Sequence, residues 1–168
     1  MAQLTREEVQ HLIGERVARG TSELSLKHAD LSGLDLSGLD LHGVRLRQAN
    51  LSTTILTEAN LSGADLIEAD LSLCDLRKAD LYQANCTGAD FTGANLTFAH
   101  VAQTNFTAAI LREANLTFAD ARRANFTLAD LTRANLREAR LQGAKLNDAD
   151  LTDARLQGAT MPDGSRHA

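Results

Sequence analysis

The sequence predicts an all-β solenoid preceded by one short α-helix, and three observations support this prediction. Every fifth residue from Leu26 to Met161 is apolar, which makes 28 positions, of which 21 are leucine. Alanine stands two residues before 21 of these positions, and Asp or Asn stands between the two in 19 repeats. The first 20 residues lack this period and carry helix signals instead. The chain is therefore expected to contain one helical segment and one long repetitive unit.

The N-terminal segment, residues 1–21, is predicted to form a capping helix. Thr5-Arg6-Glu7-Glu8 matches a capping box, and Gly20 stands where a helix C-cap is expected. The apolar residues of one helical face are Val9, Leu12, Ile13 and Val17. Because a solenoid must cover its terminal core layer, we expect this face to lie on the first coil. A helix that binds a membrane or a partner is the alternative, and its acidic residues and modest length disfavour the membrane.

The five-residue period of residues 22–161 excludes a long helix and a long strand. Five residues of α-helix advance about 140° past a full turn, so the leucines would lie on every face. In a continuous strand, successive leucines would point to opposite faces because side chains alternate. The pattern fits short extended pieces separated by corners, in which residues such as Ala64 and Leu66 both point inward. The two residues after each leucine are mostly polar or glycine, as in Ser32-Gly33, which favours a turn.

These repeats resemble the pentapeptide-repeat family, whose motif reads Ala, Asp or Asn, Leu and two variable residues, as in Ala29-Asp30-Leu31 and Ala134-Asn135-Leu136. The resemblance covers residues 22–161. It implies a right-handed quadrilateral β-helix with four repeats in each coil, and hence about seven coils. Phe98 and Phe118, which are 20 residues apart, agree with a 20-residue coil. Columns of leucine would then fill the interior and leave no room for a ligand.

The C-terminal segment, residues 162–168, is predicted to be a short polar tail with no covering helix. The last core layer would then be partly bare, and an exposed apolar patch usually marks an interface. Its residues are Leu146, Leu151, Leu156 and Met161. We therefore expect this end face to support an end-to-end homodimer through the C-terminal coil.

Composition and charge narrow the classes of function. The formal net charge is −5, with −5 in residues 24–100 and +1 in residues 101–168, so no strongly basic surface is expected and direct nucleic-acid binding is disfavoured. No apolar stretch approaches the ~18–20 residues of a membrane span, and the N-terminus lacks the basic and apolar pattern of a signal peptide. We expect a cytoplasmic protein without membrane contact. Cys74 and Cys86 occupy inward positions and are predicted to be buried, unpaired residues.

The sequence contains no recognisable catalytic or cofactor motif. The five histidines are scattered, and no phosphate-binding loop or zinc-ligand spacing is present. Aspartates such as Asp65 and Asp70 recur at the motif position and interchange with Asn, which favours a turn-stabilising role over catalysis or calcium binding. We therefore predict that the protein is not an enzyme and has no cofactor and no metal site.

The outer surface is the remaining place for function. Phe98 and Phe118 are each the second of the two turn residues that follow a position of the five-residue period, one coil apart. They are candidates for binding a protein partner, and a purely stabilising aromatic pair is the alternative. The second half is rich in arginine, which we expect to be solvated and paired with Glu113 and Glu138. These arginines are Arg112, Arg122, Arg123, Arg133, Arg137 and Arg140.

Two functions compete on this basis. The first is a non-enzymatic rigid scaffold or protein-interaction module with an unidentified protein partner, like the plain repeat proteins of cyanobacteria that the chain resembles. The second is a DNA mimic, because some members of the family bind type II topoisomerases such as gyrase and protect them from quinolones. Those members typically dimerise through a C-terminal helix, and some carry loop insertions; this sequence shows neither feature, and its arginine-rich second half interrupts an acidic surface.

Overall fold

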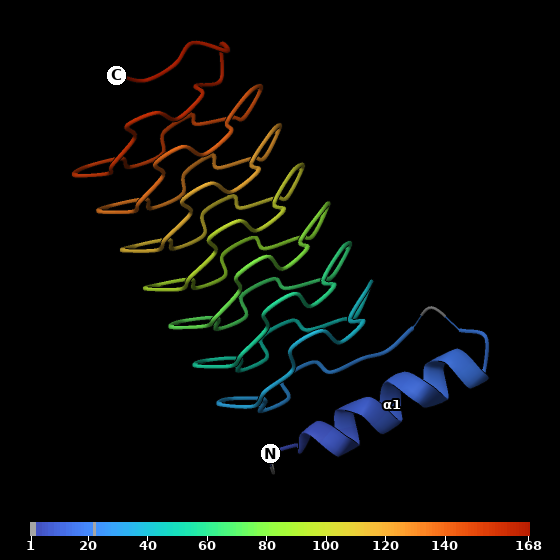
Figure 1. Cartoon of the computed structure of the whole chain (residues 1–168). Coiled ribbons are helices and arrows are strands. Elements are labelled where there is room, and N and C mark those ends of the chain that lie inside the picture. The colour runs from blue at the N-terminus through green and yellow to red at the C-terminus, as the bar shows by residue number, and fades with distance from the viewer. Residues whose placement is uncertain (1–2, 22) are drawn as a thin grey trace.

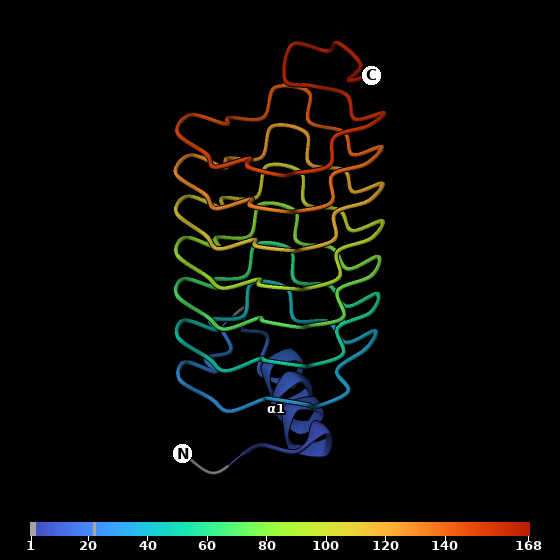
Figure 2. The ribbon, with the colours of Figure 1, turned by 90° about the vertical axis from the view of Figure 1, so that its left-hand side faces the viewer.

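The computed structural model describes residues 3–21 and 23–168 (Figure 1). It contains one helix, α1 (Arg6–Ala18), which lies at one end of a stack of coils. A view turned by 90° shows coils of similar outline stacked along one axis, with the C-terminus at the end opposite α1 (Figure 2). The predicted combination of an N-terminal helix and a β-solenoid is confirmed.

The coil repeats every 20 residues and has four sides. Parallel bridges join residues that are 20 apart, from Ser25 with Arg45 to Arg140 with Thr160. Each side contributes one bridged residue, and no longer strand forms in the described part of the chain. The expected spacing of a 20-residue coil is therefore confirmed, and residues 22–161 correspond to seven such coils.

Each corner is a four-residue β-turn closed by a backbone hydrogen bond. The N–H of Ala64, for example, donates to the carbonyl of Leu61 over 3.0 Å. The third turn residue has a positive φ throughout, from His28 to Gly158, and at 19 of these corners it is not glycine. Type II turns need a positive φ at this position.

The Asp and Asn residues of the motif stabilise the turn that follows them. All 19 accept a hydrogen bond from the backbone N–H two residues later. Where that later residue is Ser or Thr, its hydroxyl often donates to the same oxygen, as Thr152 does to Asp150 over 2.6 Å. The predicted turn-stabilising role of these residues is confirmed.

Apolar side chains fill the inside of the coils. The residues of the five-residue period are buried from Leu26 to Leu141, and the preceding alanines are buried beside them. Phe106 and Phe126 stack with ring centroids 5.0 Å apart. Thr54 and Thr104 replace alanine, and their hydroxyls donate to the carbonyls of earlier coils over 2.9 and 2.6 Å. The interior is therefore packed, and the hydroxyls of these two threonines have partners.

Helix α1 begins and ends as the sequence predicts, and most of its predicted face lies on the solenoid, with Leu12 and Ile13 partly buried against the core. Thr5 and Glu8 form the capping box, and Gly20 follows the C-cap with a φ of 62°. Val9 is fully buried, whereas the side chain of Val17, predicted to face the coils, is 68 % exposed. Arg16 is buried instead, at 8 % exposed. The prediction for Val17 was wrong because the solenoid edge needs a hydrogen-bond donor at this end of the helix.

The N-terminal segment satisfies the open edge of the first coil. Within the stack, backbone N–H groups of one coil donate to carbonyls of the next, as Leu36 does to Ile55 over 2.8 Å. On three sides, the carbonyl groups of the first coil have no preceding coil to donate to them. Residues of the N-terminal segment supply the donors instead. Their contacts are Leu4 N–H to Asp30 O at 3.1 Å, Gln3 to Ser32 O, Arg6 to Asp35 O and to Ser37 O at 3.2 Å, and Arg16 to Asp40 O at 3.3 Å and to His42 O at 2.7 Å.

The short C-terminal tail, residues 162–168, lies against the last coil. It folds back so that Arg166 pairs antiparallel with Thr160, and the Met161 N–H donates to Ser165 over 2.7 Å. Arg166 also forms an ion pair with Glu138 at 3.0 Å. The tail thus covers one side of the last coil only.

Candidate protein-interaction surface

Phe98 and Phe118 form an exposed aromatic pair on one corner of the solenoid. Both have the positive φ of the third turn position, which directs their side chains outward. They are 57 % and 48 % exposed, and their rings stack with centroids 5.0 Å apart and an interplanar angle of 5°. The outward, stacked placement that the 20-residue spacing predicts is confirmed. An exposed apolar patch made of two stacked rings results.

Polar contacts border this aromatic pair along the same corner. One coil before Phe98, the ammonium of Lys78 forms an ion pair with Glu58 at 2.9 Å. One coil after Phe118, Glu138 forms its ion pair with Arg166. An apolar centre with charged groups at its rim is the composition of many protein interfaces.

Three further exposed apolar residues lie at other corners or sides. Leu73 is 65 % exposed, Leu128 is 59 % exposed and Ile55 is 41 % exposed. Leu73 and Leu128 share the third turn position with Phe98, and the sequence period could have identified them. They belong to different 20-residue columns, so they do not extend the aromatic pair.

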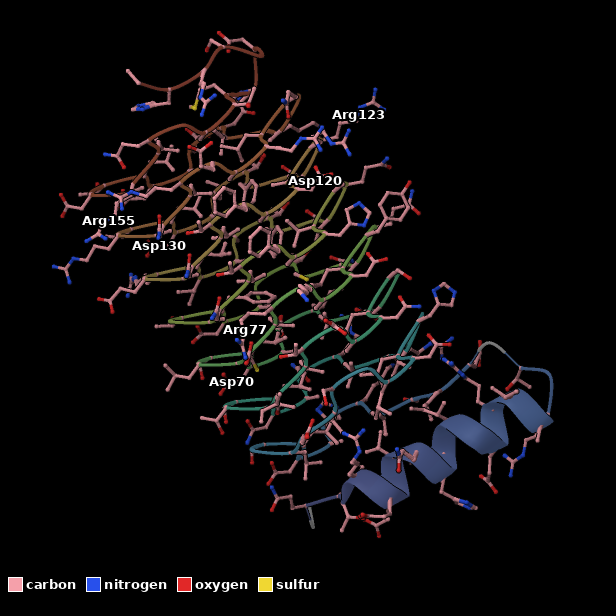
Figure 3. The ribbon with its side chains drawn as sticks, viewed as in Figure 1. Asp70, Arg77, Asp120, Arg123, Asp130 and Arg155 are labelled. Carbon is pink, nitrogen blue, oxygen red and sulfur yellow. The ribbon has the colours of Figure 1, made fainter. Side chains whose placement is uncertain are left out.

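The arginines of the second half pair with different partners from those predicted. Arg133 contacts Glu113 at 3.4 Å, as expected, whereas Glu138 contacts Arg166. The other pairs use the motif aspartates. They are Arg112 with Asp130, Arg122 with Asp120 at 2.6 Å and Arg140 with Asp120 at 3.7 Å. Figure 3 places Asp120 and Arg123 at one edge of the coils and Asp130 and Arg155 at the opposite edge.

The terminal leucines remain partly accessible at the C-terminal end. Leu146, Leu151, Leu156 and Met161 are each neither fully buried nor fully exposed. The backbone N–H groups of Leu146, Leu151 and Leu156 donate to no other backbone group in the described part of the chain. This end therefore combines apolar side chains with hydrogen-bond donors.

The interior cysteines and the charged residues form no reactive centre. Cys74 and Cys86 are buried and unpaired, and burial raises the pKa of the Cys74 thiol to about 12 and also raises the pKa of Cys86. Among residues 3–21 and 23–168, no cluster of three or more His, Cys, Asp and Glu residues could hold a metal ion. No helix within those ranges is long and apolar enough to cross a bilayer.

A four-sided solenoid with a filled core belongs to the class of β-helical repeat proteins, in which binding surfaces lie on the outside. Comparison with known families identifies the particular one. The family described as pentapeptide repeats matches residues 22–52, 54–93, 89–127 and 129–163. The chain belongs to the pentapeptide repeat family, as its motif suggested.

Solved structures similar to this chain include the two that follow, and the match to QnrB1 shows the same fold. The trypsin-treated form of QnrB1, a plasmid-mediated fluoroquinolone resistance protein, is 22 % identical with a TM-score of 0.67, and the match covers 82 % of this chain and 67 % of that one. HetL, a pentapeptide repeat protein involved in heterocyst differentiation regulation in the cyanobacterium Nostoc sp. strain PCC 7120, is 29 % identical with a TM-score of 0.30, covering 98 % and 100 % of the two chains. Comparison with functionally curated proteins produced no significant match.

Proposed function

We propose that this protein is a non-enzymatic, rigid scaffold that binds a protein partner through the outside of a right-handed β-helix. The stacked and exposed rings of Phe98 and Phe118 carry the proposal. Aromatic residues are enriched among the residues that dominate binding energy at interfaces. The filled core supports a surface role, because it leaves the interior no space for a substrate.

This function is tested by comparing which proteins the wild type and its variants retain when each is immobilised on an affinity matrix. The double variant Phe98→Ser and Phe118→Ser removes the rings and keeps the backbone. Serine suits an exposed turn as a small polar residue. We expect this variant to lose the proteins that the wild type retains on an affinity matrix, as measured by mass spectrometry. The double variant Leu73→Ser and Leu128→Ser is the matched control, because it removes exposed apolar side chains at other corners.

The two variants separate binding from stability. If both double variants lose the captured proteins equally, those proteins bind nonspecifically to exposed apolar side chains and not to the aromatic pair. Unchanged capture in the phenylalanine variant, together with a lower melting temperature, would reduce the aromatic pair to a stabilising contact, worth roughly 0.2–1 kcal/mol. Either result would contradict the proposed anchor.

Topoisomerase binding is the alternative function. The likeness to QnrB1 concerns the fold, and the charge of this chain is uneven, with −5 in residues 24–100 and +1 in residues 101–168. A DNA mimic needs a continuous acidic surface. We therefore expect no change in gyrase supercoiling and no protection from a quinolone in a supercoiling assay. Protection that depends on added protein would replace the scaffold proposal by this alternative.

We also propose that the C-terminal end face associates with a second copy through its leucines. In the described structure this end presents unpaired backbone N–H donors, such as that of Leu151, and carbonyl acceptors without a backbone donor, such as those of Ala149 and Ala154, so backbone hydrogen bonds between two copies can add to the apolar contact. Leu151→Lys is expected to abolish a concentration-dependent dimer in analytical ultracentrifugation. A wild-type chain that stays monomeric at high concentration would contradict this association.

A further inference from the structure

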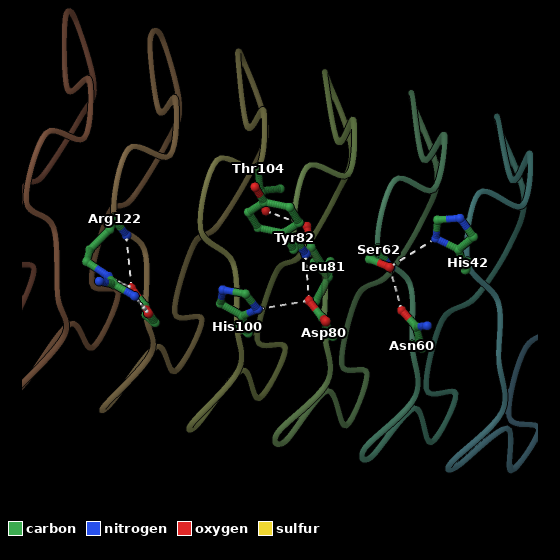
Figure 4. Close-up of polar contacts among 10 residues, drawn as sticks. His42, Asn60, Ser62, Asp80, Leu81, Tyr82, His100, Thr104 and Arg122 are labelled. Atoms are coloured by element: carbon green, nitrogen blue, oxygen red, sulfur yellow. Dashed lines mark hydrogen bonds and ion pairs between the residues drawn. The ribbon is translucent and has the colours of Figure 1, made fainter.

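A hollow on another face of the solenoid arises from one missing side chain. The second turn residue in this column is His42, Ser62, Tyr82, Ala102, Arg122 and Gln142 in successive coils. Ala102 has only a methyl group, so a space of about 380 Å³ opens over it, between the longer side chains of its neighbours. Figure 4 shows Tyr82, His100 and Arg122 on successive coils of this face. Gln103 and Arg123 also line the hollow.

The walls of the hollow are fixed by contacts within the protein. The rings of Tyr82 and His100 stack with centroids 5.4 Å apart and an interplanar angle of 12°. His100 Nδ1 lies 3.1 Å from Asp80 Oδ1. The guanidinium of Arg122 donates to both carboxylate oxygens of Asp120, over 2.7 and 2.6 Å. The hollow is therefore preorganised, which lowers the entropy lost when a ligand binds.

The hollow has an excess of positive charge. No acidic residue lines it, whereas Arg122 and Arg123 both do. Asp120 already has two cationic partners, Arg122 and Arg140. Arg123 forms no ion pair with any residue that the structure describes. A guanidinium with free N–H groups favours a carboxylate or another planar anion.

Gln142 forms the side of the hollow one coil beyond Arg122. Its Oε1 atom is buried and receives no hydrogen bond within the described structure, so it is closed to a ligand in the hollow. The cationic groups of Arg122 and Arg123 therefore determine which ligand the hollow favours.

We propose that this hollow binds an acidic side chain of an extended protein segment, with its carboxylate on the unpaired guanidinium of Arg123 and beside Arg122. The inference rests on the proposed scaffold function, because it defines the chemistry of one segment of the partner. The hollow and the aromatic pair belong to different 20-residue columns. A partner that wraps around the solenoid can contact both.

A short peptide probe tests the hollow independently of any natural partner. A fluorescein-labelled peptide of alternating Glu and Gly is titrated against the full chain, and fluorescence anisotropy gives its dissociation constant. The matched probe has Gln in place of Glu. We expect the Glu peptide to bind about tenfold more tightly than the Gln peptide. In nuclear magnetic resonance spectra, the side-chain amide of Gln142, which lines the hollow, should shift with the Glu peptide.

Two variants and one control place the binding in the hollow. Arg123→Gln removes the unpaired cation, and Ala102→Leu fills the space without changing charge; each should weaken Glu-peptide binding about tenfold. Ile67 occupies the corresponding turn position of another repeat, so an aliphatic side chain is compatible with this turn. Arg133→Gln removes an exposed arginine from another corner and should leave the dissociation constant unchanged.

Each outcome decides the proposal. Equal binding of the Glu and Gln peptides, equal weakening by Arg133→Gln, or no Gln142 shift at millimolar Glu peptide would overturn it. Tighter binding of inorganic phosphate than of the Glu peptide would assign the hollow to another anion. The Phe98 and Phe118 variant should retain peptide binding, so loss of the hollow and loss of the aromatic anchor are separate results.

Discussion

The third residue of each turn has a left-handed backbone conformation, and this conformation is strained for every residue except glycine. A non-glycine residue in this region costs about 1–2 kcal/mol relative to the right-handed form. Nineteen corners nevertheless carry a side chain. Their contacts with the coil above or below, such as the stack of Phe98 on Phe118, offset part of this cost.

Gly93 is a corner where a side chain has no space. Its φ is +66°, and a Cβ atom would lie 2.8 Å from Cδ2 of Leu73. We expect Gly93→Ala to lower the free energy of unfolding by roughly 1–2 kcal/mol, as measured by urea denaturation. Leu73→Ala alone should change it by less than about 0.5 kcal/mol, because Leu73 is exposed.

The double variant of Gly93 and Leu73 separates the two causes. If the clash contributes, the double variant is more stable than the sum of the single variants predicts, by about 0.5–1 kcal/mol. Additive effects would assign the whole loss to backbone strain at Gly93.

Several aspartates of the motif should make the stability of the folded protein decrease at acid pH, because their pKa values are lowered in the folded state. Hydrogen bonds from Thr152, first through its side chain and then through its backbone, lower the pKa of Asp150. For Asp120, burial raises the pKa, but the hydrogen bonds and charges of Arg122 and the charge of Arg140 outweigh it, so the net shift is downward. A carboxyl group with a lowered folded pKa stabilises the protein above its unfolded pKa and loses this effect as pH falls through the folded value.

We therefore expect the melting temperature to be constant from neutral pH to about pH 5 and to fall below about pH 4, the unfolded pKa of Asp. Asp150→Asn keeps an acceptor for Thr152 and removes one titrating group, so its melting temperature should fall less steeply in acid. A slope equal to that of the wild type would contradict this role of Asp150. Asp153→Asn, in the following turn, is the matched control.

At the scale of elements, α1 acts as a replacement for a missing coil. Its side chains donate to the carbonyls that a preceding coil would otherwise occupy. An open edge of a β-structure is a site for unwanted pairing, and native proteins cover such edges. The helix therefore closes the edge as well as the core.

Loss of one of these donors should destabilise the first coil. Arg16→Met keeps much of the buried side-chain volume but leaves the carbonyls of Asp40 and His42 without their donor. We expect a loss of about 2–3 kcal/mol in urea denaturation, because hydrogen bonds from charged groups contribute ~1.5–3 kcal/mol. Arg19→Met is the control, since Arg19 pairs only with Glu15 on the surface, and should cost less than about 0.5 kcal/mol. Equal losses in the Arg16→Met and Arg19→Met variants would show that Arg16 stabilises the protein through its positive charge and not through hydrogen bonds to these carbonyls.

At the scale of the whole molecule, the sequence made the solenoid, helix α1 and the stack of Phe98 on Phe118 predictable, whereas contacts that depend on neighbouring coils were not. The positions of Leu66 and Asp70 follow from local turn geometry that every repeat shares, so one motif describes them all. The burial of Arg16 depends on carbonyl groups that only the unfinished coil exposes, and a helical pattern contains no information about them. The hollow over Ala102 likewise depends on which side chains lie in the coils above and below, and the motif leaves those residues variable.

A solenoid of this kind should also differ in local stability along its axis, because each coil contacts only its neighbours. In the middle, the Leu71 N–H donates to the next coil over 2.7 Å, whereas Leu146 and Leu151 lack such a backbone acceptor in the described structure. Amide hydrogen exchange should therefore be fast at Leu146 and Leu151 and slow at Leu71. Met161 should exchange slowly despite its terminal place, because the returning tail accepts its N–H. Equal protection along the chain would instead indicate that all coils open together in one cooperative unit.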